Sequence, residues 1–169
     1  LVPIARYIDW ITTTPLLMYE LGHLAHASTA NTMMLVGSDI LMIAAGILSA
    51  CLDRQRQYRM MLFYFAVSCV FYVVMLCIIN VRLANGTVLQ QTDSVQELFG
   101  YLKVLTSTVW TFYPIVVFLG RAQCHLISKN TEDCLLCFLD LAAKLGMEGL
   151  IIAFAVFSID GSDGSDGSA

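Results

Sequence analysis

The residues best suited to proton chemistry lie in stretches of this 169-residue chain that are otherwise apolar. Asp140 and Lys144 are four residues apart, so a helix places them on one face, where they can meet. Leucine, alanine and glycine surround Lys144. Desolvation favours the neutral amine, which can attack an aldehyde and form a Schiff base. The alternative is a structural ion pair that holds two helices together.

A second group of ionisable side chains lies near the start of the chain. Asp9 and Glu20 are eleven residues apart, which is about 16 Å of helical rise on roughly one face. Two carboxylates at different depths suit a stepwise proton path. Arg6 shares this face and is expected to keep Asp9 ionised, whereas paired structural charges are the alternative. A further acidic residue, Asp39, is expected to form structural hydrogen bonds.

The elements that position these residues are predicted to be membrane-spanning helices. The chain is 58% hydrophobic and 13% charged, with a mean hydropathy of +0.74. A helix needs about 20 mostly apolar residues to cross a bilayer, and its backbone must be hydrogen-bonded internally there. Such runs occupy residues 3–24, 33–52, 60–81, 104–120 (extended by 94–103) and 134–159. Polar connectors are expected at residues 25–32, 53–59, 82–95 and 121–133.

Composition also limits the partners and the domain organisation. The net charge of −4 provides no basic surface, so a nucleic-acid partner is not expected. The pair Cys134 and Cys137 lacks the second pair that a zinc site needs, so no metal is expected. Residues 1–159 are predicted to form one all-α membrane domain. Residues 160–169 read as a flexible Gly/Ser/Asp tail or linker.

Four segments resemble helices of the microbial (type 1) rhodopsins, in the right order. RYIDWITTTPLL (residues 6–17) resembles their third helix, and GSDILM (37–42) resembles the fourth. WTFYP (110–114) resembles the sixth helix, and LDLAAKLG (139–146) resembles the seventh. The resemblance implies five helices of a seven-helix bundle, the third to the seventh. On this basis the first two helices are expected to be missing before Leu1, as in a piece of a longer polypeptide.

The resemblance also implies roles for individual residues. Lys144 would carry all-trans retinal as a Schiff base, with Asp9 and Asp140 as counterions. Asp9 would also be the first proton acceptor, Arg6 would organise the cluster, and Thr13 would hydrogen-bond Asp9. The residues expected to surround or brace the chromophore are Trp10, Thr14, Leu17, Asp39, Met42, Trp110 and Tyr113, with Thr14 and Asp39 bridging the third and fourth helices.

Glu20 corresponds to the cytoplasmic proton donor of the family. Asp9, Thr13 and Glu20 together resemble the signature of proteorhodopsin-like outward proton pumps, and the resemblance therefore implies a light-driven transporter rather than an enzyme. Two alternatives stay open. Glu148, where the family has a small residue, is compatible with a light-gated cation channel, and the linker-like tail is compatible with a photosensor or part of a larger fusion.

Two further departures from the family pattern are expected to matter. Ala122 takes one position of the bacteriorhodopsin proton-release pair, while Glu132 takes the other. Val117 replaces a tryptophan and loosens the pocket near the retinal ring.

The chain is expected to be a multi-pass membrane protein, with the plasma membrane as its location and lipid, protons or cations, and further copies of itself as partners. Family orientation places the connectors 53–59 and 121–133 outside, although these are richer in Lys and Arg than the inside connectors. The sequon at Asn85 then lies inside and is expected to be unglycosylated.

Overall fold

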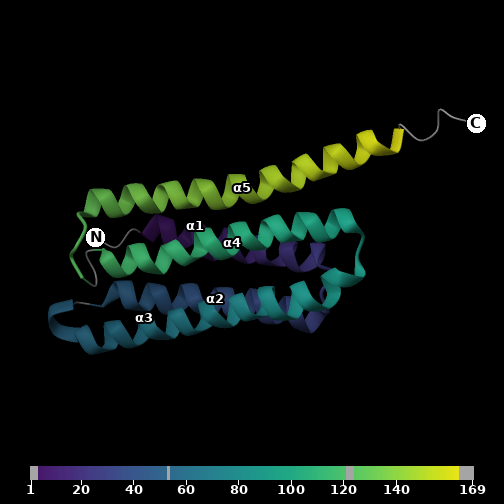
Figure 1. The fold of residues 1–169 in the computed structure, drawn as a ribbon. Helices are drawn as coiled ribbons and strands as arrows, with labels where there is room; N and C mark the ends of the chain where they lie inside the picture. The colour runs from purple at the N-terminus through teal and green to yellow at the C-terminus, as the bar shows by residue number, and fades with distance from the viewer. Residues whose placement is uncertain (1–3, 53, 121–123, 164–169) are drawn as a thin grey trace, which may run out of the picture.

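The computed structural model describes residues 4–52, 54–120 and 124–163, which form a bundle of long helices (Figure 1). Five α-helices follow one another along the chain: α1 (Ile4–Leu24), α2 (Thr29–Cys51), α3 (Arg54–Cys77), α4 (Asp93–Leu119) and α5 (Lys129–Asp163). Successive helices alternate in direction, so α1 and α5 run the same way. The predictions of an all-α architecture and of five long helices are confirmed.

Three of these helical segments are long and apolar enough to cross a membrane: α2, the helix from Gln55 to Gln90, and α4. The other two helices, α1 and α5, carry the ionisable side chains singled out above, except Asp39, which lies on α2. In hydrocarbon such side chains are costly and lie toward a bundle interior or an aqueous cavity.

The predicted connector at residues 82–95 is wrong. The helix of α3 continues through a π-helix, η1 (Ile78–Thr87), and a 3₁₀ turn, η2 (Val88–Gln90), and only residues 91 and 92 precede α4. Leu83 and Val88 are buried in the core, so their packing keeps this polar-looking segment helical.

The other helix boundaries differ less from the predicted ones. α3 begins at Arg54, inside the predicted connector, with a kink at Gln57, where φ is −129° and ψ is 29°. α5 begins at Lys129 and continues to Asp163, so it extends past the predicted domain end at residue 159. The rest of the predicted tail, residues 164–169, lies outside the described residues, as does Ala122.

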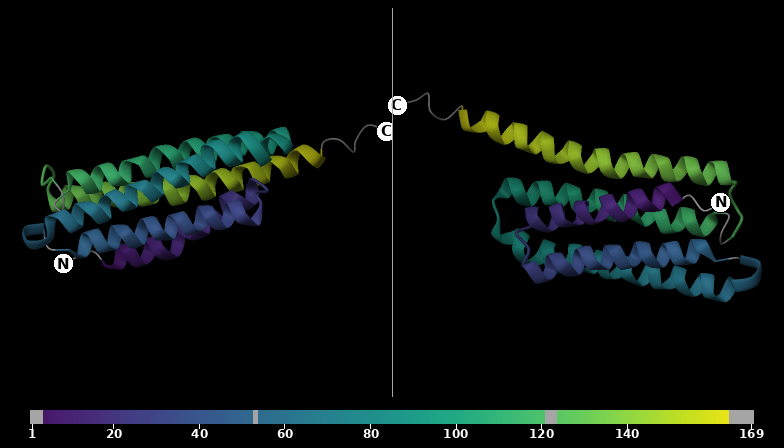
Figure 2. Two further views of the ribbon diagram at one scale, coloured as in Figure 1. Left: turned by 90° about the horizontal axis from the view of Figure 1, so that it is seen from below. Right: turned by 180° about the vertical axis from the view of Figure 1, so that it is seen from behind.

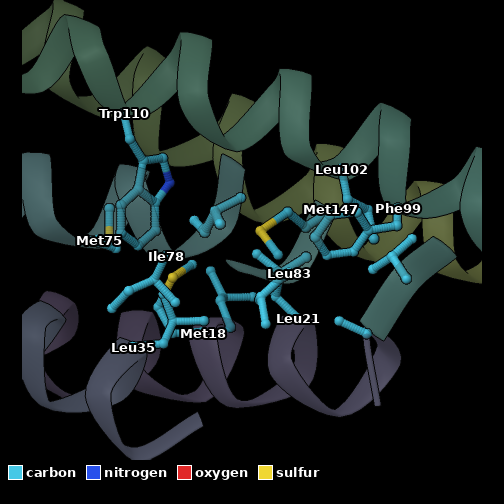
Figure 3. Close-up of a cluster of buried hydrophobic side chains, with 14 of the residues drawn as sticks. Met18, Leu21, Leu35, Met75, Ile78, Leu83, Phe99, Leu102, Trp110 and Met147 are labelled. Carbon is cyan, nitrogen blue, oxygen red and sulfur yellow. The ribbon is translucent and has the colours of Figure 1, made fainter. Parts of the chain in front are cut away.

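The bundle core joins all five helices. α2 packs along both α1 and α3, while α5 packs along α4, and the two views of Figure 2 agree on this pairing. Met18, Leu35, Met75, Phe99 and Met147 come from five different helices and meet in one buried cluster (Figure 3). Within a bilayer the stabilisation comes from close van der Waals packing, because lipid is as apolar as these side chains.

Close approach of α4 and α5 depends on a small residue next to the candidate site. A Cβ added at Gly146 would lie 2.8 Å from a methyl carbon of Leu105, closer than real contacts allow. Gly146 follows Lys144 by two residues. Its lack of a side chain therefore sets how near the lysine-bearing segment lies to α4.

Candidate functional site

The centre of the candidate site is an ion pair between the two charged helices. Lys144 of α5 donates through Nζ to Oδ2 of Asp9 on α1, 135 residues earlier in the chain. Both side chains are partly buried. The i,i+4 spacing predicted that Lys144 could meet Asp140, but the ion pair found for Lys144 is with Asp9.

Asp140 is held instead by aromatic donors from two other helices. Trp10 Nε1 donates to its Oδ1 over 2.7 Å, and the Tyr113 hydroxyl donates to the same oxygen over 2.8 Å. The two rings pack edge to face, with centroids 5.3 Å apart. The two donors therefore fix the position of the Asp140 carboxyl group one helical turn before Lys144.

Arg6 binds carboxylates of α5. Its Nη1 donates to Asp133 Oδ1 over 3.1 Å and Nη2 to the main-chain oxygen of Asp133 over 3.3 Å, while Nε lies 3.9 Å from Asp140 Oδ2. The expected ion pair between Arg6 and Asp9 is not among the described contacts. Sequence reasoning did not single out Asp133. The signal was available, because Asp133 precedes Asp140 by seven residues, which is two turns on one face.

The two threonines expected at the site behave differently. The Thr13 hydroxyl donates over 2.8 Å to the main-chain carbonyl of Asp9, not to its carboxylate as the resemblance implied. This i−4 bond within the helix is a common alternative for threonine. Thr14 donates to Asp39 Oδ2 over 2.8 Å and so joins α1 to α2, as expected. Asp39 is fully buried, and this bond gives one of its two carboxyl oxygens a donor, while Oδ1 has no hydrogen-bond partner among the described residues.

A cavity of about 590 Å³ extends from this charged cluster into the bundle. The expected wall residues Trp10, Leu17, Met42, Trp110 and Tyr113 all line it, together with Lys144. Ligand cavities of this size, mostly apolar with a few polar groups, are typical binding sites for small molecules.

Sequence reasoning missed the contribution of α3 to this cavity. Phe65, Ser68 and Tyr72 line it together with Val117 of α4. The Tyr72 hydroxyl lies 2.5 Å from Thr111 Oγ1, so the ring is fixed between α3 and α4. These residues belong to an uncharged apolar run, where no sequence signal separated cavity wall from core.

Glu20 and Glu148 lie apart from this cluster. Both side chains are exposed, and neither lines the cavity. Glu148 follows Lys144 by one turn of α5, and Glu20 lies three turns beyond Asp9 on α1. The two glutamates therefore lie beyond Lys144 in the direction in which both helices run.

Comparison with known proteins places the chain within one family. The model for bacteriorhodopsin-like proteins matches residues 1–159. Bacteriorhodopsin from Halobacterium salinarum is 30% identical over 148 residues, which cover 88% of this chain and 55% of that protein. Cruxrhodopsin-1 from Haloarcula argentinensis is 32% identical over 167 residues, covering 93% of this chain and 63% of the relative. The chain thus spans a little over half the length of these relatives.

Solved structures agree on the fold. The thermophilic rhodopsin from Rubrobacter xylanophilus superposes with a TM-score of 0.82 at 31% identity, covering 89% of this chain and 66% of that one. A light-driven proton pump from Leptosphaeria maculans also gives 0.82, at 26% identity, covering 89% and 62%. Halorhodopsin gives 0.81 at 26% identity, covering 88% and 60%. The arrangement of α1 to α5 is therefore shared with several rhodopsins.

Proposed function

Because the chain belongs to the bacteriorhodopsin-like family of microbial rhodopsins, we propose that it acts in a light-driven outward proton pump. The family consists of integral membrane proteins that carry retinal on a lysine, and retinal is the cofactor of this chain. The observation that carries the proposal is the ion pair of Lys144 with Asp9, which sets a carboxylate against the nitrogen that would lose a proton.

The residues around the cavity fit retinal. Lys144 lies at the wall of a space of about 590 Å³, beside Trp10, Trp110 and Tyr113. The lining combines a charged group around Asp140 and Lys144 with many apolar and aromatic side chains, among them Met42 and Phe65. A long apolar ligand with one polar, reactive end matches this distribution. When bound, retinal supplies light absorption and the isomerisation that changes the proton affinity of its linkage to the lysine.

Asp9 is the proposed proton acceptor. It contacts Lys144 Nζ directly, so a proton can transfer between them without rearrangement of the backbone. Asp140 is the proposed second counterion of Lys144, and Trp10 and Tyr113 hold its carboxyl group in place. Arg6 lies on the side of this pair toward the N-terminal ends of α1 and α5.

Glu20 is the proposed group that returns a proton to Lys144. It lies on the opposite side of Lys144 from Arg6, three turns along α1 from Asp9. A proton that leaves through Asp9 and returns from Glu20 crosses the site in one direction. In the family orientation that direction is outward.

Photocurrents under voltage clamp test the proposal, using the full-length protein with retinal. A pump gives current of one sign at every membrane voltage, and illuminated cells acidify the medium. A protonophore should abolish the acidification. If protein that has bound retinal and is coloured does not acidify the medium under illumination, the proposal is wrong.

A second candidate function is a light-gated cation channel. The observation that favours it is the pair of exposed glutamates, Glu20 and Glu148, which lie beyond Lys144 along α1 and α5. Carboxylates of this kind can serve a cation as well as a proton. A photocurrent that reverses sign with voltage would support the channel, and a current that stays outward would exclude it.

A further inference from the structure

Arg6 is shared unequally between two carboxylates of α5. Two of its nitrogens bind Asp133, through the side chain at 3.1 Å and the main chain at 3.3 Å. Its Nε approaches Asp140 only to 3.9 Å, which is longer than a hydrogen bond. The cation is therefore held mainly by the residue farther from Lys144.

Asp140 has a carboxyl oxygen that can accept a closer contact from Arg6. Trp10 and Tyr113 both donate to its Oδ1, while Arg6 faces its other oxygen, Oδ2. The Arg6 side chain is 17% exposed, so the charge is poorly screened and acts strongly on nearby carboxylates. A small displacement of the guanidinium toward Oδ2 would complete the set of donors around Asp140.

We infer that Asp133 is a positioning residue that holds Arg6 near the start of α5 and so limits how strongly this cation stabilises the negative charges of Asp140 and Asp9. The inference rests on the proposed function for the roles of Asp9 and Lys144. Asp133 itself contacts neither residue, and it lies eleven residues, about 16 Å along α5, before Lys144.

Other titratable groups surround the cluster and have to be controlled for. They are Tyr7 of α1, Cys51 of α2, Cys69 and Tyr72 of α3, Tyr113 of α4, and Lys129 and Glu132 of α5. Glu132 is the charge-matched neighbour of Asp133. Its carboxylate packs over Gly120, where an added Cβ would lie 2.6 Å from Glu132 Cδ.

The readout is the midpoint pH of the acid-induced colour change of the retinal-loaded protein. Neutralising the carboxylate beside the chromophore nitrogen changes the absorption, so the midpoint reports protonation of Asp9. In Asp133→Asn, Arg6 moves toward Asp140 and stabilises both anions. The midpoint should therefore fall by about one pH unit, the usual size of the effect of a nearby opposite charge. Asp133→Glu, which keeps the carboxylate, should restore most of the original midpoint.

A double variant separates positioning from a direct charge effect. In an Arg6→Gln background, Asp133→Asn should have little effect, because its action passes through the arginine. An undiminished shift without Arg6, or a midpoint in Asp133→Glu equal to that of Asp133→Asn, would overturn the inference.

Asp9→Asn distinguishes failure of this inference from failure of the proposed function. The colour change should disappear in this variant. If it persists, Asp9 is not the titrating counterion, and both proposals are wrong. If it disappears while Asp133→Asn leaves the wild-type midpoint unmoved, only the role of Asp133 is wrong. Should Arg6→Gln fail to form coloured protein, the comparison of Asp133→Asn with Asp133→Glu still decides, because only the second variant keeps a carboxylate for Arg6 to bind.

Discussion

The two sides of Lys144 are built differently. Toward the N-terminal ends of α1 and α5, Asp140 accepts two hydrogen bonds and Arg6 bridges toward Asp133. Toward the other end, Glu20 and Glu148 are exposed, and the structure gives their carboxylates no hydrogen bond among the described residues. One side holds its charged groups with hydrogen bonds and ion pairs, whereas the other leaves its carboxylates exposed.

This difference matches two tasks. A group that accepts a proton from Lys144 benefits from neighbours that are already oriented, because no reorganisation is needed when charge moves. A group that collects protons from solution needs contact with water. We call the part with Arg6, Asp9 and Asp140 the ordered side and the part with Glu20 and Glu148 the exposed side. We therefore expect substitutions on the ordered side to change proton transfer from Lys144. Substitutions on the exposed side should change how fast protons arrive from solution.

The largest effect is expected at the residue between the two sides. Lys144→Ala removes the amine that binds the cofactor, so visible absorption by the protein and any photocurrent should be lost completely. Absorption spectra after addition of retinal provide the measurement. Lys103→Ala on α4 is the control and should still give coloured protein. A coloured Lys144→Ala variant with retinal covalently bound would contradict the assignment.

On the ordered side, Asp9→Asn should reduce transport by at least about 100-fold, the usual cost of losing a positioned acid–base group. The protein should still bind retinal, because Asp9 does not line the cavity. Photocurrent per coloured molecule is the measurement, with Asp93→Asn at the start of α4 as the control. Transport that survives in Asp9→Asn would show that another group accepts the proton.

On the exposed side, Glu20→Gln should slow the return of the proton by about tenfold or more. The return should then depend on the proton concentration in solution, which makes it slower as pH rises. Flash-absorption kinetics at several pH values measure this dependence. A return rate that is unchanged at every pH would remove Glu20 from the path.

Glu148→Gln sharpens the comparison within the exposed side. In a pump it removes only an exposed charge that does not line the cavity, so the return rate should change by about two- to threefold, as for other exposed charges. The sign of the photocurrent should stay the same at every voltage. If the current reverses with voltage and Glu148→Gln moves the reversal potential, the channel hypothesis is correct instead.

The smallest effect is expected away from both sides, at the contact between α1 and α2. Thr14→Val removes the donor to the buried Asp39, which should cost about 1–3 kcal/mol of stability because a buried polar group loses its partner. Thermal bleaching of the coloured protein measures the loss. Thr12→Val is the matched control, since Thr12 is exposed and bonds only within its own helix. Equal losses in the two variants would contradict the role of the bridge.

Much of the bundle was predictable from hydropathy alone, because apolar runs of membrane length can satisfy their backbone only as helices. The segment at residues 82–95 was mispredicted because its polar residues resemble a loop. Leu83 and Val88 keep it helical by packing into the core. Local composition cannot show that an isolated apolar residue will pack against side chains of other helices.

For the site, the sequence by itself determined which side chains share a helix face: Arg6 with Asp9, and Asp140 with Lys144. Spacing along the chain determines which side chains share a face, because successive residues of a helix are rotated by a constant angle about its axis. Only the tertiary structure decided that Lys144 pairs with Asp9 and Arg6 with Asp133. Partners across helices depend on how two helices are rotated and shifted against each other. That register is set by the packing of the whole bundle, including the close approach at Gly146.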